Sequence, residues 1–230
     1  LLFFQKLGVN DCQFTGNLKF TSTPKKIDIK VKNELKKKFS GRQLLVAAST
    51  HPGEEDEIYK ITETIRKKNP DFLTIIIPRH PNRNQFFSNQ NNKNIVFRSS
   101  KEKIKKDTSI YLVDTYGELH IFYSIADFIF IGGSFVDHGG QNPIEAAFYG
   151  KIINHGKNIQ NFTDVYSVLS QMNITNQVNN SNQLRHYIVS NYLKKTKTSK
   201  AINLRKLQSE GKSAMKNVIT IIDQYLPKNK

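Results

Sequence analysis

Apolar residues occur along this sequence in two patterns, short continuous runs and longer segments with helical spacing. The continuous runs are rich in small, branched and aromatic residues, which is typical of strands buried on both faces. Such runs predict six strands, at Gln43–Thr50, Phe72–Pro78, Asn94–Ser99, Ser109–Asp114, Asp127–Gly133 and Lys151–His155. Strands that are apolar on both sides predict a parallel sheet that is covered on both faces.

The segments between these runs carry apolar residues at helical spacing. In residues 53–69 the side chains of Ile58, Ile61 and Ile65 recur on one helical face, and acidic residues come first and basic residues last, as the helix dipole favours. Further helices are predicted at 117–126, 142–150, 161–172, 182–195 and 201–226. This alternation predicts an α/β fold, a Rossmann-like parallel sheet with helices on both faces.

The residues before the first strand are expected to lie outside this domain. The sequence LLFFQKLGV at the start is typical of the end of a helix, and its first residue is Leu1 rather than Met. We therefore expect residues 1–28 to form a linker and the end of a preceding domain. Residues 29–230 are expected to form the Rossmann-like domain, with the C-terminal helices packing back.

The composition fits either a basic, soluble surface or an anionic partner, and it does not choose between them. The chain has 35 Lys and Arg against 19 acidic residues, a formal net charge of +16. Nucleic acid, anionic lipid and a phosphorylated substrate all fit such a charge. No aromatic and basic motif of a single-strand binder is present, and no apolar run approaches the ~20 residues of a membrane span. The single cysteine, Cys12, excludes an internal disulfide and fits a reducing compartment.

Polar motifs follow four of the predicted strands, at their carboxyl ends. They are STHPGEE at 49–55, PRHPNR at 78–83, DTYGEL at 114–119 and GGSFVDHGGQNPIE at 132–145. Ligands bind beyond the carboxyl ends of the strands in sheets of this kind. We therefore expect the four loops to form one site.

The last of these loops has the features of a phosphate and sugar site. Its first glycine pair, 132–133, lacks the Cβ atoms that would block a ligand, and its second, 139–140, permits a tight turn into a helix. Asn142 can cap that helix, Pro143 suits its first turn, and Glu145 can accept hydrogen bonds from two sugar hydroxyls. The pattern fits equally well a capped glycine-rich turn in which Glu145 only favours the helix dipole.

Three histidines, His51, His80 and His138, fall in these loops, but their spacing matches no zinc motif and no cysteine accompanies them. We expect neither a metal nor another cofactor. Arg79 is either a surface residue or a phosphate ligand, and Glu118 at a helix start is favourable there in any case. No nucleophile elbow and no Walker A loop is present.

Five motifs together resemble one enzyme family. TGNLKF at 15–20, HPGEE at 51–55, PRHPNR, DTYGEL and GGSFVDHGGQNPIEAA occur in the order and at the spacings of the 3-deoxy-D-manno-octulosonic acid (Kdo) transferases of lipid A assembly. The resemblance extends from Gly8 to the end of the chain. The combination is specific, whereas the glycine-rich element alone is shared more loosely among glycosyltransferases.

The resemblance implies a C-terminal, donor-binding domain of a GT-B glycosyltransferase, with residues 29–230 binding CMP-Kdo. It further implies transfer of Kdo to a lipid A precursor (lipid IVA) at the cytoplasmic face of the inner membrane of a Gram-negative bacterium, without a metal. The implied CMP-binding residues are Pro78, Arg79, Tyr116, Gly117, Glu118, Asn142, Pro143, Ile144 and Glu145. Lys19 would stabilise charge in the transition state.

The family's general base is a Glu of the N-terminal domain, near a membrane anchor, and neither falls within this chain. The chain alone is therefore expected to bind nucleotide weakly and to catalyse little or nothing. Family members often have Met, His and Pro where Tyr116, Gln141 and Ala146 stand. These changes bear on donor detail more than on donor class.

The partners implied are CMP-Kdo, a lipid A precursor, the anionic inner-membrane surface and the N-terminal domain, and we expect no nucleic acid. Two alternatives stay open. One is the donor domain of another GT-B enzyme, such as one that uses UDP-sugars. The other is a non-catalytic product, either a split-gene remnant or a basic module that binds nucleic acid.

Overall fold

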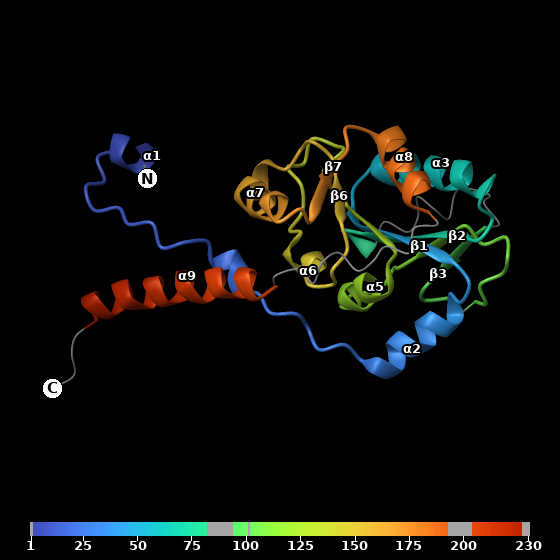
Figure 1. Cartoon of the computed structure of the whole chain (residues 1–230), viewed down its shortest axis with the longest axis horizontal. Coiled ribbons are helices and arrows are strands. Elements are labelled where there is room, and N and C mark those ends of the chain that lie inside the picture. Colours follow the sequence, from blue (N-terminus) through green and yellow to red (C-terminus); the bar gives the residue numbers. More distant parts are fainter. Residues whose placement is uncertain (1, 82–93, 101, 193–203, 227–230) are drawn as a thin grey trace. The chain divides into compact units, whose positions relative to one another are not determined.

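The structure of the chain is a computed structural model that describes residues 2–81, 94–100, 102–192 and 204–226 (Figure 1). It contains two compact units. One consists of residues 24–202, and the other joins residues 1–23 to residues 203–230. This division differs from the boundary predicted after residue 28, because the last helix groups with the N-terminal segment rather than with the sheet.

The unit 24–202 is built on one parallel sheet. Its strand order is β3-β4-β2-β1-β5-β6-β7, and every neighbouring pair is parallel. The bounds are β1 Gln43–Thr50, β2 Phe72–Pro78, β3 Ile95–Phe97, β4 Ile110–Leu112, β5 Phe128–Ile131, β6 Ile153–His155 and β7 Thr175–Gln177. The predicted parallel sheet is confirmed, and each of the six predicted strands contains an observed one. The edge strand β7 was not predicted.

Helices cover both faces of this sheet (Figure 1). They are α2 Ile29–Lys38, α3 Glu54–Arg66, α5 Leu119–Ile125, α6 Ile144–Ala147, α7 Thr163–Gln171 and α8 Ser181–Asn191. Helices α3 and α8 pack together over one face, α2 and α5 over the other, and α7 lies beside β7. The predicted α/β architecture is therefore confirmed. Helix α2 was not predicted, and α6 is shorter than the predicted helix 142–150.

One large cluster of the core lies between the sheet and α3 and α8. Ile58, Ile61 and Ile65 of α3, the residues predicted to share a helical face, are buried there against the strands. All residues of β2 and β5 are buried, as expected for strands covered on both sides. The sequence pattern thus positions the strands, and the strands place their following loops at one edge.

Strand β1 ends irregularly. Its register with β2 shifts between Ala48 and Thr50, and the intervening Ser49 has φ +54°, a left-handed conformation that is uncommon for a residue with a Cβ. Strained backbone of this kind concentrates at functional sites. The irregularity lies directly before His51 and the loop that leads into α3.

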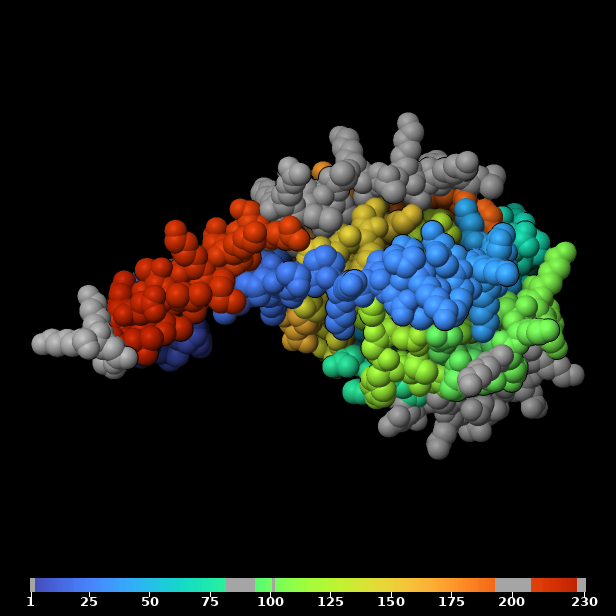
Figure 2. All heavy atoms as spheres, turned by 90° about the horizontal axis from the view of Figure 1, so that it is seen from below, coloured from blue at the N-terminus to red at the C-terminus, as the bar shows by residue number. Residues whose placement is uncertain are grey.

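The other unit contains α1 Leu2–Lys6, the short 3-10 helix η1 Leu18–Thr21 and α9 Leu204–Tyr225. Residues 11–20 run antiparallel to α9. Tyr225 Oη donates to Asp11 Oδ2 over 3.4 Å, Asn217 Nδ2 donates to the carbonyl of Thr15 over 3.2 Å, and Phe20 of η1 is buried. Figure 2 shows these blue residues against the red α9.

Two glycines make this close packing possible. A Cβ on Gly16 would lie 2.8 Å from the Cβ of Ala214, and one on Gly211 would lie 2.2 Å from the carbonyl oxygen of Phe20. Neither approach is compatible with a side chain. The helix predicted at 201–226 is thus observed as α9, and residues 201–203 lie outside the described residues.

Candidate functional site

The loops predicted to form a site lie at the carboxyl edge of the sheet. Strand order reverses at β1, since β2, β4 and β3 lie on one side of it and β5, β6 and β7 on the other. The connections that follow β1 and β5 therefore diverge, and the crevice between them is where open α/β sheets bind ligands. The loops 49–55, 78–81, 114–119 and 132–145 all reach this edge. Residues 82 and 83 of the PRHPNR motif lie outside the described residues.

One buried carboxylate joins the loops after β1 and β5. Glu54, 1% exposed in the first turn of α3, accepts four backbone hydrogen bonds. Its Oε2 accepts from the amides of His51 at 2.9 Å and Gly133 at 2.7 Å. Its Oε1 accepts from Ser134 at 3.0 Å and Phe135 at 2.9 Å. The amides at the start of the glycine-rich loop are thus satisfied by the protein's own carboxylate.

The prediction that Gly132 leaves room for a ligand is wrong. A Cβ there would lie 2.6 Å from both the Ser49 carbonyl oxygen and the Thr50 Cα, and 2.8 Å from Glu54 Oε2. The missing side chain makes room for the end of β1 and for Glu54. The second pair behaves as predicted, because Gly139 and Gly140 have φ of +91° and +78°, which a tight turn requires.

Two of the three loop histidines come together. The rings of His51 and His138 stack with centroids 3.8 Å apart at 34°, and Gln141 Nε2 lies 3.1 Å from His51 Nε2. His80 is exposed at the end of β2. Among the described residues no group of three or more His, Cys, Asp or Glu side chains is arranged to hold a metal. The expectation that the reaction needs no metal stays a prediction.

The loop after β2 carries Pro78 and Arg79. Pro78 is the buried last residue of the strand, and the amide of Arg79 donates to the carbonyl of Thr50 over 3.0 Å. The side chain of Arg79 is exposed. This arrangement ties the backbone of Arg79 to the end of β1 while its guanidinium faces the solvent at the ligand edge.

The loop after β4 contains Tyr116, Gly117 and Glu118. Tyr116 is 71% exposed, and Gly117 has φ +86°. The carboxylate of Glu118 is already engaged by hydrogen bonds within the protein. It accepts from Arg98 Nη2 at 2.7 Å, from Arg98 Nε at 3.1 Å and from Thr115 Oγ1 at 2.5 Å. Burial would raise the pKa of Glu118, but the hydrogen bonds from Arg98 and Thr115 outweigh it and lower the pKa.

Sequence reasoning missed Arg98 and Glu54. Arg98 lies one residue past β3, inside a segment predicted as strand, so the available signal was a basic side chain at a carboxyl edge. Glu54 lies in the STHPGEE motif, where its sequence signal is only that of an acidic residue at a helix start. Neither signal identifies the group that the side chain binds. Glu118, which binds Arg98, and the glycine-rich loop, which binds Glu54, are distant from them in sequence.

At the start of α6 the structure corrects two predicted roles. Asn142 Oδ1 accepts from the amide of Ile144 over 3.0 Å, but Asn142 lies one residue before the cap position. That position is held by Pro143, which precedes the first helical residue, Ile144, and makes no capping side-chain hydrogen bond. The helix is only four residues long, so its dipole contributes little to an anion site.

Glu145 carries an unsatisfied acceptor. Within the residues that the structure describes, its Oε1 is buried and has no hydrogen-bond partner, and the hydroxyl of Tyr149 is in the same position. Burial, and then the charge of Glu145, raise the pKa of Tyr149 to about 12. Buried polar atoms are normally paired, so these two atoms are candidates for contact with a ligand.

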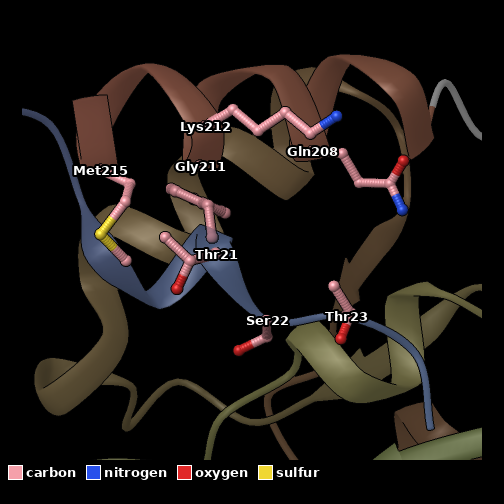
Figure 3. A pocket seen from close by; sticks show the side chains of 8 residues that line it. Thr21, Ser22, Thr23, Gln208, Gly211, Lys212 and Met215 are labelled. Atoms are coloured by element: carbon pink, nitrogen blue, oxygen red, sulfur yellow. The ribbon is translucent and has the colours of Figure 1, made fainter.

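Lys19 belongs to the other unit, in η1. Its amide donates to Asn17 Oδ1 over 2.9 Å, which caps the 3-10 turn. Beside it, η1 and α9 enclose a hollow of about 330 Å³ (Figure 3). The hollow is lined by Phe20, Thr21, Ser22, Thr23, Gln208, Gly211, Lys212 and Met215.

No family model matches the sequence. Individual proteins do. The chain is 32% identical to the 3-deoxy-D-manno-octulosonic acid transferase of Rickettsia prowazekii (strain Madrid E) over 97% of its own length and 50% of that protein. It is 28% identical to the transferase of the same name from Haemophilus influenzae (strain Rd), over 94% of the chain and 52% of the relative. The chain is thus a homologue of the Kdo transferases.

The fold agrees with this family. The structure resembles the C-terminal CMP-Kdo binding domain of WaaA from Acinetobacter baumannii with a TM-score of 0.68 at 23% identity, covering 86% of this chain and 99% of that one. The parallel α/β fold expected from the motifs is thereby confirmed. The chain spans about half the length of the Kdo transferases that it matches.

Proposed function

We propose that this chain is the donor-binding half of a Kdo transferase, which transfers Kdo from CMP-Kdo to a lipid A precursor in lipopolysaccharide assembly. The observation that carries the proposal is Glu145, whose buried Oε1 has no hydrogen-bond partner among the described residues. Leaving such an atom unpaired costs about 1–3 kcal/mol. A sugar hydroxyl of the donor that donates to it removes that cost.

The other site residues have complementary roles in this proposal. Arg79 supplies a cation to the phosphate of CMP, and Tyr116 offers an exposed aromatic ring to the cytosine. Since the carboxylate of Glu118 is engaged by Arg98 and Thr115, Glu118 acts through its backbone and by fixing its loop. Asn142 fixes the start of α6 and so the direction of Glu145; Pro78, Gly117, Pro143 and Ile144 shape the backbone of the site.

The reaction follows from the donor. A hydroxyl of the acceptor attacks the anomeric carbon of Kdo, the bond from that carbon to the phosphate oxygen breaks, and CMP leaves with the electron pair. The hydroxyl proton passes to a general base in the other half of the enzyme. Lys19 offsets the negative charge that develops during transfer. The proposal needs no metal ion or other cofactor.

The partner of this chain is the N-terminal half of the family's polypeptide, because the relatives are about twice as long. An apolar stripe on α9 fits such a partner. It consists of Met215, Ile219 and Ile222 of α9 and of Leu226 directly after the helix, which are 41%, 50%, 50% and 56% exposed. Residues 11–20 pack along a neighbouring face of the helix, where Met215 also lines the hollow beside η1. Burying the stripe against a second domain removes apolar surface from water.

The net charge of +16 suits a site of action at the cytoplasmic face of the bacterial inner membrane. Lys and Arg near an anionic surface contribute about 1 kcal/mol each. None of the helices in the described part of the chain has the length and apolarity of a membrane span. The attraction we propose is therefore that of a basic protein surface for lipid phosphates.

The transfer reaction itself tests the function. The chain is fused to the N-terminal half of the Rickettsia prowazekii relative and incubated with CMP-Kdo and a tetraacylated lipid A precursor, and products are analysed by mass spectrometry. We expect Kdo addition by the fusion and none by either half alone. A folded fusion that forms no product contradicts the proposal. Binding of UMP and UDP in preference to CMP would instead favour the UDP-sugar alternative.

A further inference from the structure

Glu54 connects three segments of the proposed donor site. Its four acceptor contacts reach the loops after β1 and β5, as described above. The carbonyl of Gly133, one of the residues it holds, accepts from the amide of Gly140 over 2.8 Å. Gly133 is thereby fixed at one end of the turn whose other end leads into Asn142 and Glu145.

The same carboxylate also acts on the loop after β2. Glu54 holds the amide of His51, and the carbonyl of the preceding residue, Thr50, accepts from the amide of Arg79 over 3.0 Å. The backbone of Arg79 is thus joined to Glu54 through two residues. A displacement of Glu54 would move the cation and the sugar-binding acid of the site relative to one another.

Other side chains cannot replace Glu54 at this position. Each carboxylate oxygen accepts two amides, so all four contacts require two acceptor atoms. Gln would place an NH₂ group against amides that donate, and Asp is one methylene shorter. The absence of a side chain at Gly132 leaves the space in which Oε2 lies.

We propose that Glu54 is a positioning residue of the donor site, which sets the glycine-rich loop and thereby the geometry of Arg79 and Glu145. This inference rests on the proposed function, and Glu54 itself contacts no substrate in it. Its effect is on donor affinity through the loop, in addition to the stability that any buried carboxylate of this kind contributes. Those two effects can be separated by experiment.

Glu55 offers a matched control. It is the next residue of α3, it is 2% exposed, and its Oε1 accepts from Thr50 Oγ1 over 3.0 Å. Glu54→Gln and Glu55→Gln therefore remove one buried carboxylate each from the same helical turn. They differ in that Glu54 holds amides of the glycine-rich loop, at Gly133 and the two residues after it.

The measurements are CMP affinity by calorimetry, thermal unfolding, and amide hydrogen exchange with ¹H–¹⁵N spectra. We expect Glu54→Gln to weaken CMP binding by about tenfold or more, the scale seen when a supporting contact is lost. The amides of Gly133, Ser134 and Phe135 should exchange slowly in the wild type and faster in this variant. Glu55→Gln keeps an oxygen that can accept from Thr50 Oγ1, so it should lower Tm less and leave CMP affinity within about twofold of wild type.

If Glu54→Gln does not fold, Glu54→Asp is the variant to test. Asp keeps the carboxylate but is one methylene shorter, so the same loss of CMP affinity is expected. CMP affinity unchanged in a folded Glu54 variant overturns the proposal. Fast exchange of the three amides in the wild type does the same. A wild-type chain that binds no CMP overturns the proposed function, and the positioning role with it. In that case the hydrogen exchange of the three amides still shows whether Glu54 holds the loop.

Discussion

Arg98 holds the carboxylate of Glu118 at both oxygens, with Nη2 2.7 Å from Oε1 and Nε 3.1 Å from Oε2. This bidentate pair joins the end of β3 to the loop after β4. It fixes the loop that carries Tyr116 and Gly117 at the ligand edge of the sheet. The pair connects residues 20 positions apart in the chain, so it also stabilises the β3–β4 side of the domain.

A change in pH tests this pair. The pKa of Glu118 is lowered from its ordinary value of 4.5, so the pair contributes stability above pH ~4.5, and this contribution is lost as the pH falls through the lower pKa of the folded state. We expect Arg98→Met to cost about 1 kcal/mol in the free energy of unfolding at pH 7, since the pair is partly exposed. Urea unfolding of the wild type and of Arg98→Met, at pH 7 and below pH 4, measures the free energy of unfolding of each protein at each pH. The wild type and Arg98→Met should differ less at the acid pH; an equal difference at both contradicts the assignment.

Replacing Gly211 of α9 by Ala tests the packing of α9, because helix propensity and the structure predict opposite effects on stability. By helix propensity alone Gly211→Ala would stabilise an exposed helix by about 1 kcal/mol. In the structure the added Cβ would lie 2.2 Å from the carbonyl oxygen of Phe20. We therefore expect Gly211→Ala to loosen residues 11–20 from α9 and to increase their cleavage by protease. Ser213→Ala, at an exposed position of the same helix, is the control. A Gly211→Ala variant as resistant as wild type would show that the two segments do not pack this closely.

The apolar stripe of α9 predicts a domain interface. Ile219→Ser combined with Ile222→Ser should weaken association with the N-terminal half of a Kdo transferase by about tenfold or more, because both side chains are half exposed and available for burial. Lys216→Ser and Thr220→Ala, at exposed positions outside the stripe, form the control pair. Association is measured by calorimetry with the separately produced N-terminal half. Equal affinities for the two double variants would exclude the stripe from the interface.

The basic surface predicts a preference for anionic lipid. Vesicles that contain phosphatidylglycerol should bind the chain more tightly than neutral phosphatidylcholine vesicles, and the difference should shrink as salt is raised. Sedimentation of the chain with each kind of vesicle measures this. Equal binding to the two would leave the net charge of +16 without a membrane role.

The sheet was predictable from the sequence because its inner strands are buried on both faces. Runs such as Phe72–Pro78 have no polar alternation and fit little else. The edge strand β7, Thr175–Gln177, has no apolar run at all and exists because it pairs with β6. Its formation depends on a neighbour, so no local pattern could identify it.

Helix α2 was missed for a different reason. Its sequence IKVKNELKKK is dominated by lysine and buries Leu35 alone. A start signal was present, since Asp28 Oδ1 caps the amides of Lys30 and Val31 at 2.9 and 3.2 Å. Here the capping residue carried more information than the apolar pattern.

The candidate site was predictable as a set of loops and not as a set of contacts. The positions of Arg79 and Glu145 followed from the strand ends, because parallel strands deliver their loops to one edge. The pairing of Glu118 with Arg98, and of Glu54 with the glycine-rich loop, joins residues distant in sequence. Those pairings depend on strand order, and strand order is a property of the fold.

The central claim is that this chain binds the nucleotide of CMP-Kdo through Glu145. Titration calorimetry with CMP, with UMP as the control ligand, tests it on the wild type and on Glu145→Ala. We predict that the wild type prefers CMP to UMP, and that Glu145→Ala loses about tenfold or more in CMP affinity, the equivalent of one lost hydrogen bond to a charged group. CMP binding that Glu145→Ala leaves unchanged, or no preference for CMP over UMP, would contradict the account.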